Sequence, residues 1–323
     1  MSRRILPFWR ALLLAGGAAF PRSNQADPAT AEFSGWSTNG PAVYRNSRLP
    51  VTNLTLRTGS YITNQTFVHF LPGSLNDFVW TNLLARTNGR SPHLWSVNAH
   101  PPGWPAQPPS VAWNTNSLVW GMKGMTALSP CWMGEGAHGQ VPVTALTRRH
   151  GYTRGHGMAP DGLCNTWKGQ KVWFVTKENR LVAATIARTM VRISQADYTI
   201  FLFRDNLPAS IEPLRVAAFT NVTARFPDCP GAPWPVFQKE QTGQINAGIP
   251  GFTMNARKGG DSGSPNLLAL ANELIFFGGR GTAGPLPQMQ ADMDALCRLE
   301  KLDPSKHQLQ WADLSRFPNY PKR

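Results

Sequence analysis

Short apolar runs separated by glycine- and proline-rich turns extend over most of this chain. The sequence contains 29 glycines and 28 prolines among 323 residues, and only 15% of its residues are charged. Proline breaks the interior of a helix, and both glycine and proline are common in the turns between strands. This pattern argues against a helical bundle or a long disordered chain. It predicts an all-β fold with enough residues for a sizeable core.

The strand-like runs become denser after about residue 111. Runs rich in β-branched and aromatic residues lie at 141–146, 171–176, 181–186, 198–203, 215–219 and 273–277. One helix is predicted late in the chain, at 287–302, where apolar residues recur at helical spacing. Its apolar stripe consists of Met289, Met293, Leu296 and Leu299.

The first 26 residues are typical of an export signal. Arg3 and Arg4 precede a short apolar stretch at 11–20, and small residues near Ala19 or Ala26 offer a cleavage site. The apolar stretch is too short for a full membrane span. We therefore expect residues 1–26 to be a signal peptide, no stable membrane span after its removal, and a secreted or periplasmic, cell-envelope protein. An ordinary hydrophobic helix or an uncleaved anchor is the alternative.

Residues 27–110 form an N-terminal extension of unknown role. They are rich in Asn, Thr, Pro and Trp, and the proline-rich stretch 101–109 is typical of an extended connector. One alternative is that this extension is a module that binds carbohydrate or the cell envelope.

The net charge of +14 arises from 32 basic and only 18 acidic residues. The basic residues are scattered, without a run of five or six, so we do not expect a nucleic-acid partner. The four cysteines allow up to two disulfides in an oxidising compartment, with Cys131 and Cys164 as the first pair to test. No Cys-x-x-Cys motif occurs, and no metal site is expected.

A serine framed by glycines lies near the end of the chain. Residues 259–265 read Gly-Gly-Asp-Ser-Gly-Ser-Pro and precede an apolar, strand-like run. Glycines allow a tight turn with exposed backbone N–H groups, which together with a hydroxyl nucleophile suit acyl transfer. The plainer interpretation is a surface turn. Ser262 therefore needs a base and an acid elsewhere in the chain.

Two histidines, His150 and His156, lie six residues apart and are the candidate bases. Imidazole titrates near neutral pH, so it can accept a serine proton and later return it. The candidate acids are Asp197, which opens the apolar run at 198–203, and Asp205, which lies in a turn-like segment after it.

The Gly-Asp-Ser-Gly-Ser-Pro motif resembles the nucleophile loop of the chymotrypsin/trypsin-like serine proteases. The resemblance covers about 111–302 and implies a trypsin-like protease domain at 111–323, folded as a double six-stranded β-barrel with a C-terminal helix. It favours His156 over His150, although Arg154 and Gly155 stand where the family has small alanines. The implied catalytic triad is His156, Asp197 and Ser262, in the chain order of this family.

The resemblance also implies the remaining parts of a substrate site. Gly260 and Ser262 would supply the oxyanion hole, and Ala256, Phe277 and Gly279 would line the substrate pocket. Ala256 at the pocket floor argues against a trypsin-like preference for Arg or Lys.

The leading hypothesis is a secreted serine endopeptidase that hydrolyses protein or peptide substrates through an acyl-enzyme and needs no cofactor. The alternative is a catalytically inactive protease-fold binding or scaffold protein of the cell envelope.

Overall fold

The computed structural model describes residues 32–33, 41–43, 50–58, 61–68, 73, 75–87, 89–96, 111–130, 141–194, 196–217, 236–239, 243, 245–248, 262–279 and 286–317. The proposed signal peptide at 1–26 and the connector at 101–109 lie outside these residues. Among the helices of the described part, none is long and apolar enough to cross a membrane.

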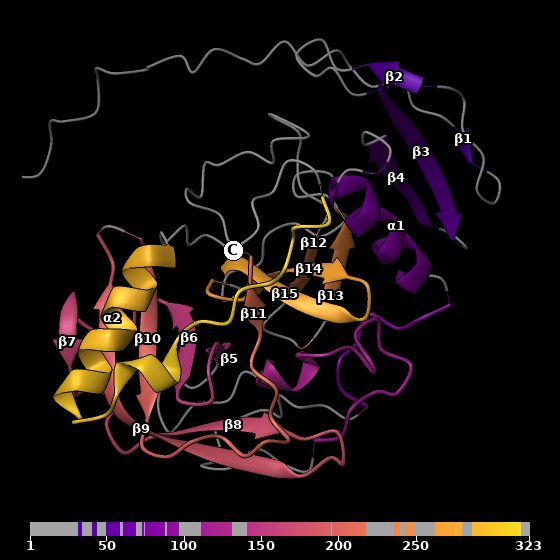
Figure 1. The fold of residues 1–323 in the computed structure, drawn as a ribbon. Coiled ribbons are helices and arrows are strands. Elements are labelled where there is room, and N and C mark those ends of the chain that lie inside the picture. Colours follow the sequence, from indigo (N-terminus) through magenta and orange to yellow (C-terminus); the bar gives the residue numbers. More distant parts are fainter. Residues whose placement is uncertain are drawn as a thin grey trace, which may run out of the picture.

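A six-stranded antiparallel sheet forms the first half of the body (Figure 1). The strand order is β5–β6–β10–β9–β7, and β8 pairs with β9. The strands are β5 (Thr144–Ala145), β6 (His150–Arg154), β7 (Gly162–Cys164), β8 (Lys171–Val175), β9 (Leu181–Arg192) and β10 (Tyr198–Phe203). Every residue of β10 is buried, as its aromatic and β-branched composition predicts for a central strand.

A five-stranded sheet forms the second half, in the order β11–β15–β14–β12–β13. The strands are β11 (Arg215–Val216), β12 (Val236–Lys239), β13 (Ile245–Gly248), β14 (Pro265–Leu270) and β15 (Glu273–Gly279). β14 and β15 form a tight hairpin through Ala271 and Asn272, and Ala271 adopts a left-handed backbone conformation, with φ of 56°. Only the β11–β15 pair is parallel within this sheet.

The body therefore consists mainly of antiparallel sheets with few helices, but the expected double six-stranded barrel is not observed. Closing a barrel requires its two edge strands to pair with each other. In the described part of the chain, β5 and β7 remain edges of the first sheet, and β11 and β13 remain edges of the second. Among the described residues, the second sheet has five strands.

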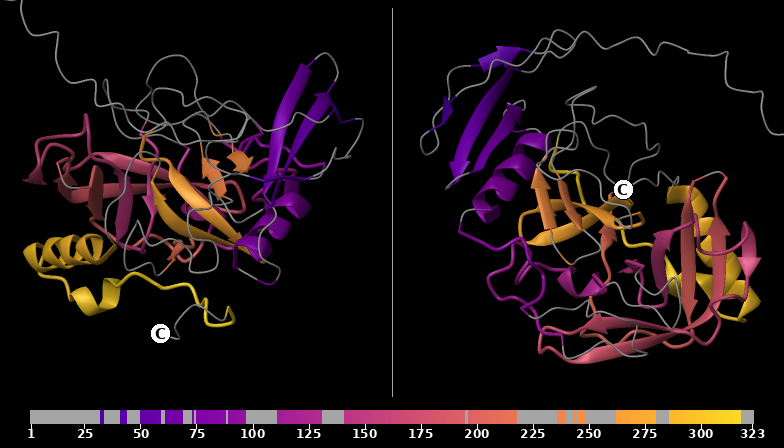
Figure 2. Two further views of the ribbon diagram at one scale, coloured as in Figure 1. Left: turned by 90° about the horizontal axis from the view of Figure 1, so that it is seen from above. Right: turned by 180° about the vertical axis from the view of Figure 1, so that it is seen from behind.

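Helix α2 (Leu286–Leu299) lies against the first sheet, next to β9 and β10 (Figures 1 and 2). It occupies most of the range predicted from the apolar stripe, and Met289, Met293 and Leu296 are buried. Leu299 of that stripe is instead half exposed, because the helix ends there. The 3-10 helix η2 (Pro304–His307) follows α2.

The N-terminal region contributes a four-stranded sheet and helix α1 (Leu75–Thr87). The strands are β1 (Glu32–Phe33), β2 (Pro41–Val43), β3 (Pro50–Thr58) and β4 (Tyr61–Val68). α1 packs against β12, β13 and β14, and the Trp95 ring contacts Trp113 at 4.3 Å between centroids. Residues 75–96 thus share a core with the residues that follow 111, where the 3-10 helix η1 (Met125–Ala127) is also buried.

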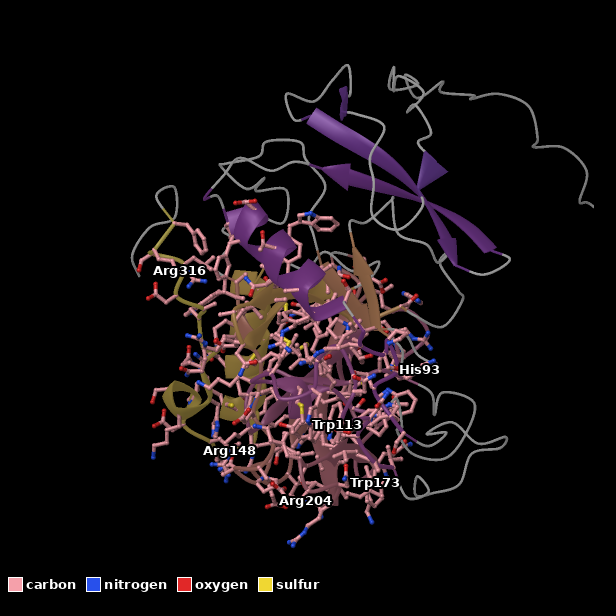
Figure 3. All side chains as sticks on the ribbon, turned by 90° about the vertical axis from the view of Figure 1, so that its right-hand side faces the viewer. His93, Trp113, Arg148, Trp173, Arg204 and Arg316 are labelled. Atoms are coloured by element: carbon pink, nitrogen blue, oxygen red, sulfur yellow. The ribbon has the colours of Figure 1, made fainter. Side chains whose placement is uncertain are left out.

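The main hydrophobic core lies between the two large sheets. The Tyr152 ring of β6 contacts the Phe276 ring of β15 edge-on, at 5.0 Å between centroids. Figure 3 shows Trp113 among the side chains of this interior and Arg316 at the periphery, where its guanidinium lies 4.1 Å from the centre of the Phe78 ring of α1. The C-terminal segment therefore packs against the N-terminal helix.

Candidate active site

The pairing of β6 with β10 brings the predicted base and acid together. The two strands are antiparallel, with Tyr198 opposite Arg154. Consequently His156, two residues after the end of β6, lies beside Asp197, the residue just before β10.

Both oxygens of the Asp197 carboxylate bind His156. Oδ2 lies 2.6 Å from the His156 ring nitrogen Nδ1, and Oδ1 accepts a hydrogen bond from the His156 backbone N–H at 2.7 Å. A carboxylate accepts, so Nδ1 carries a proton, and in the neutral form of the ring Nε2 keeps its lone pair. The His156 side chain is 46% exposed and that of Asp197 25% exposed, so the ring is accessible from solvent.

The backbone around Asp197 has an unusual conformation that only a glycine neighbour permits. Asp197 has φ of 50°, in the left-handed region that aspartate tolerates better than most residues. Its carbonyl accepts a hydrogen bond from the Gly155 N–H at 3.0 Å. A Cβ on Gly155 would lie 2.8 Å from the Arg192 carbonyl oxygen and 2.9 Å from the Tyr198 nitrogen. Gly155 thus allows the segment before His156 to approach Asp197 closely.

The serine turn belongs to the second sheet and packs against the end of β6. Ser262 is partly buried and lies three residues before the start of β14. Gly263 has φ of 82°, and a Cβ there would lie 2.2 Å from the backbone nitrogen of Arg154. The turn therefore rests on Arg154, two residues before His156. The two sheets meet at this point, where the glycine after Ser262 lies against the strand that leads to His156.

The other predicted site residues are placed only in part. Ala256 and Gly260 lie outside the described residues. Gly279 ends β15 and pairs with Pro265, which places the end of β15 beside the start of β14. Phe277 is partly buried and packs against the apolar cluster beneath α1.

His150 lies inside the core, away from Asp197. Two backbone N–H groups donate to the Thr147 hydroxyl oxygen, so its O–H donates to His150 Nδ1, at 2.9 Å. Nε2 lies 3.6 Å from the Cys297 sulfur. Burial first, and then the charges of His307 and Arg149, lower the pKa of His150 to about 3. A neutral, enclosed imidazole of this kind has a structural role.

Asp205, the other candidate acid, is exposed just after the end of β10. Asp197 precedes the opposite end of the same strand. The geometry therefore pairs His156 with Asp197 and leaves both competitors elsewhere.

Cys164 and Cys297 are free thiols, so a bond from Cys164 to Cys131 is not formed in this structure. Cys131 and Cys229 lie outside the described residues. Burial raises the pKa of Cys297 to about 11, which keeps it a thiol. Within the described ranges, no group of three potential ligands is arranged to hold a metal ion.

We expect His150 to make stability depend on pH. The pKa of His150 in the folded chain lies below its unfolded value of 6.5. Its contribution to the free energy of unfolding is therefore fully present above pH 6.5 and is lost as the pH falls toward 3. The loss approaches about 1.4 kcal/mol per pH unit.

His150→Gln should remove this part of the pH dependence of the free energy of unfolding, measured by urea unfolding between about pH 7 and pH 4. The control Leu202→Val, at the cross-strand partner of His150, should lower stability equally at each pH. An unchanged slope in His150→Gln would contradict the assignment.

Sequence reasoning missed two acids near the site in the chain or in the sheet, Asp161 and Asp292. Asp161, five residues after His156, accepts hydrogen bonds from the Ile193 N–H and the Ser194 hydroxyl, and these bonds lower its pKa. Asp292 of α2 binds Arg192 and Tyr198. An acid in an amphipathic helix is normally exposed, so the sequence carries no signal for this role.

No family model and no curated protein matches the chain. Among solved structures, the chain is similar to kallikrein-related peptidase 10, with a TM-score of 0.30 and 12% sequence identity. The match covers 53% of this chain and 97% of that chain. The likeness is weak, and the function proposed below rests on the geometry of the site.

Proposed function

We propose that the protein is a secreted serine endopeptidase, with Ser262 as nucleophile, His156 as base and Asp197 as the acid that orients the base. The observation that carries this proposal is the double contact of the Asp197 carboxylate with His156. A second contact supports it, because Gly263 packs against the strand that leads to His156.

In the proposed reaction, Ser262 Oγ attacks the carbonyl carbon of a peptide bond and passes its proton to His156 Nε2. Asp197 accepts the Nδ1 hydrogen bond, fixes the tautomer and stabilises the imidazolium that forms. The backbone N–H groups of Gly260 and Ser262 donate to the developing oxyanion. The C–N bond then breaks, and His156 returns the proton to the leaving amine. A water molecule, activated by the same imidazole, hydrolyses the acyl-enzyme and regenerates the serine.

The substrate would lie along the end of β15. Gly279 pairs with Pro265, so this strand runs next to the serine turn. The last residues of the strand would pair with the backbone of an extended peptide. Ala256, Phe277 and Gly279 would form an apolar pocket. An apolar side chain is accordingly the proposed preference at the cleavage position.

A burst experiment tests the proposal. With a p-nitrophenyl ester, the purified chain should release about one equivalent of p-nitrophenol before steady state, because an activated ester acylates the serine faster than the acyl-enzyme is hydrolysed. Ser262→Ala and His156→Ala should abolish the burst. Ser264→Ala is the matched control and should retain it, since the Ser264 hydroxyl is buried in the same turn. A folded wild-type chain without a burst would support the inactive scaffold instead.

A further inference from the structure

A buried carboxylate of α2 lies behind the proposed triad. Asp292 is only 2% exposed. Its Oδ2 accepts hydrogen bonds from the Tyr198 hydroxyl at 2.7 Å and from Arg192 Nε at 2.9 Å. Its Oδ1 accepts from Arg192 Nη2 at 2.5 Å and from Gln288 at 3.2 Å. One helix residue thus binds two neighbouring strands.

The two residues that Asp292 binds frame the strained backbone of Asp197. Tyr198 directly follows Asp197 in the chain. Arg192 of β9 is the cross-strand partner of Tyr198. The backbone atoms nearest to a Cβ on Gly155 belong to Arg192, Tyr198 and Asp197. Asp292 therefore binds the side chains of two residues whose backbone surrounds Gly155, next to His156.

We propose that Asp292, through the Tyr198 hydroxyl and the Arg192 guanidinium, is a positioning residue that holds Asp197 in its left-handed conformation against His156. The consequence for catalysis rests on the proposed function, whereas the positioning itself does not. Helix α2 thereby acts as a support for the acid of the triad.

The electrostatics of the cluster favour a permanently formed network. Burial and the hydrogen bond to Asp292 raise the pKa of Tyr198, so its hydroxyl keeps its proton. The hydrogen bond to Asp292 also raises the pKa of Arg192. Charge-assisted, bidentate hydrogen bonds of this kind are stronger than neutral ones and fix orientation.

The chain supplies a matched control just after the same helix and on the same strand. Arg188, four residues before Arg192 in β9, donates to Glu300 just after α2. Arg188 lies opposite Leu202, toward the other end of β10 from Tyr198. Glu300→Gln therefore weakens the attachment of the same helix to the same strand without touching the residues beside Asp197.

Hydrogen exchange of the His156 backbone amide, measured by NMR on the full chain, reports the positioning directly, because this N–H donates to Asp197 Oδ1. Tyr198→Phe removes one hydroxyl, and Asp292→Asn removes the charge. Each should speed exchange at His156 by at least about tenfold relative to amides elsewhere in the first sheet. Glu300→Gln should not change that ratio. If Tyr198→Phe leaves the ratio at the wild-type value, the proposal is overturned.

The reaction of Ser262 with a fluorophosphonate reports the catalytic consequence. Tyr198→Phe should slow the maximal labelling rate by about five- to tenfold with little change in the half-saturating concentration. In an Asp197→Asn background, the same change should have no further effect. One outcome would separate the two proposals. If the variants show faster amide exchange at His156 but the wild-type chain is not labelled by the fluorophosphonate, the positioning role of Asp292 is upheld and the proposed function is refuted. An additive effect in the Asp197→Asn background would show that Asp292 acts on stability alone.

Discussion

Replacing Asp197 with asparagine is expected to lower kcat for ester hydrolysis by about 10⁴-fold, with KM changed little. The asparagine amide presents a donor where the carboxylate accepted the Nδ1 proton, so the ring adopts the tautomer with its proton on Nε2. That ring cannot accept the proton of Ser262. The variant also lacks the negative charge of the Asp197 carboxylate, which in the wild type stabilises the imidazolium and accepts the hydrogen bond of the His156 backbone N–H.

The measurement is kcat and KM on a p-nitrophenyl ester with wild type and Asp197→Asn. Asp205→Asn is the matched control, because Asp205 is an exposed acid beyond the other end of β10. It should keep wild-type kcat. A fall of less than about tenfold in Asp197→Asn would contradict the role of Asp197 as the orienting acid.

Gly263→Ala is expected to displace the serine turn from the end of β6. The new Cβ would lie 2.2 Å from the Arg154 nitrogen, and φ of 82° disfavours a side chain. Strain at such a position and overpacking each cost about 1–3 kcal/mol. Ser262 would shift relative to His156, and a misplacement of about 1 Å can lower the rate about 10²-fold.

Urea unfolding and the rate of fluorophosphonate labelling measure the two effects of Gly263→Ala. Gly169→Ala isolates the cost of the backbone conformation, since Gly169 has φ of 86° and a Cβ there would meet no atom within 4 Å. It should lower stability modestly and leave labelling at the wild-type rate. Equal effects of the two substitutions would show that the contact with Arg154 has no part in placing the serine.

The local features of the site were predictable where one segment carries the signal. The strand at 198–203 is a run of buried aromatic and β-branched residues, and it forms β10 with the same bounds. The late helix followed from its apolar stripe, and α2 ends three residues earlier than expected. The glycine-framed serine indicated a tight turn, and Gly263 does adopt a positive φ.

Contacts between distant segments were not predictable in the same way. Arg154 and Gly155 departed from the alanines of the resembled family. The structure gives Gly155 a physical reason, because any side chain would strike the backbone of Arg192 and Tyr198. The role of Asp292 depends on how α2 docks on β9 and β10, which no local pattern encodes.

Part of the N-terminal extension at 27–110 packs into the body of the protein, which its composition did not indicate. Leu83, Leu94 and Trp95 belong to the same buried core as residues after 111. Apolar residues in a proline-rich segment carry no information about what they pack against. A carbohydrate- or envelope-binding role of residues 27–110 stays a hypothesis, best tested on the full chain because part of this region is buried in the body.

The central claim is that Ser262 is a nucleophile activated by His156 and Asp197. Intact mass followed by peptide mapping, after incubation of the folded chain with a fluorophosphonate, tests it most directly. We predict one adduct per chain, located on Ser262, which is absent in Ser262→Ala and in His156→Ala and present in Ser264→Ala. A folded wild-type chain that gains no adduct, or one that carries it on another residue, would contradict the claim.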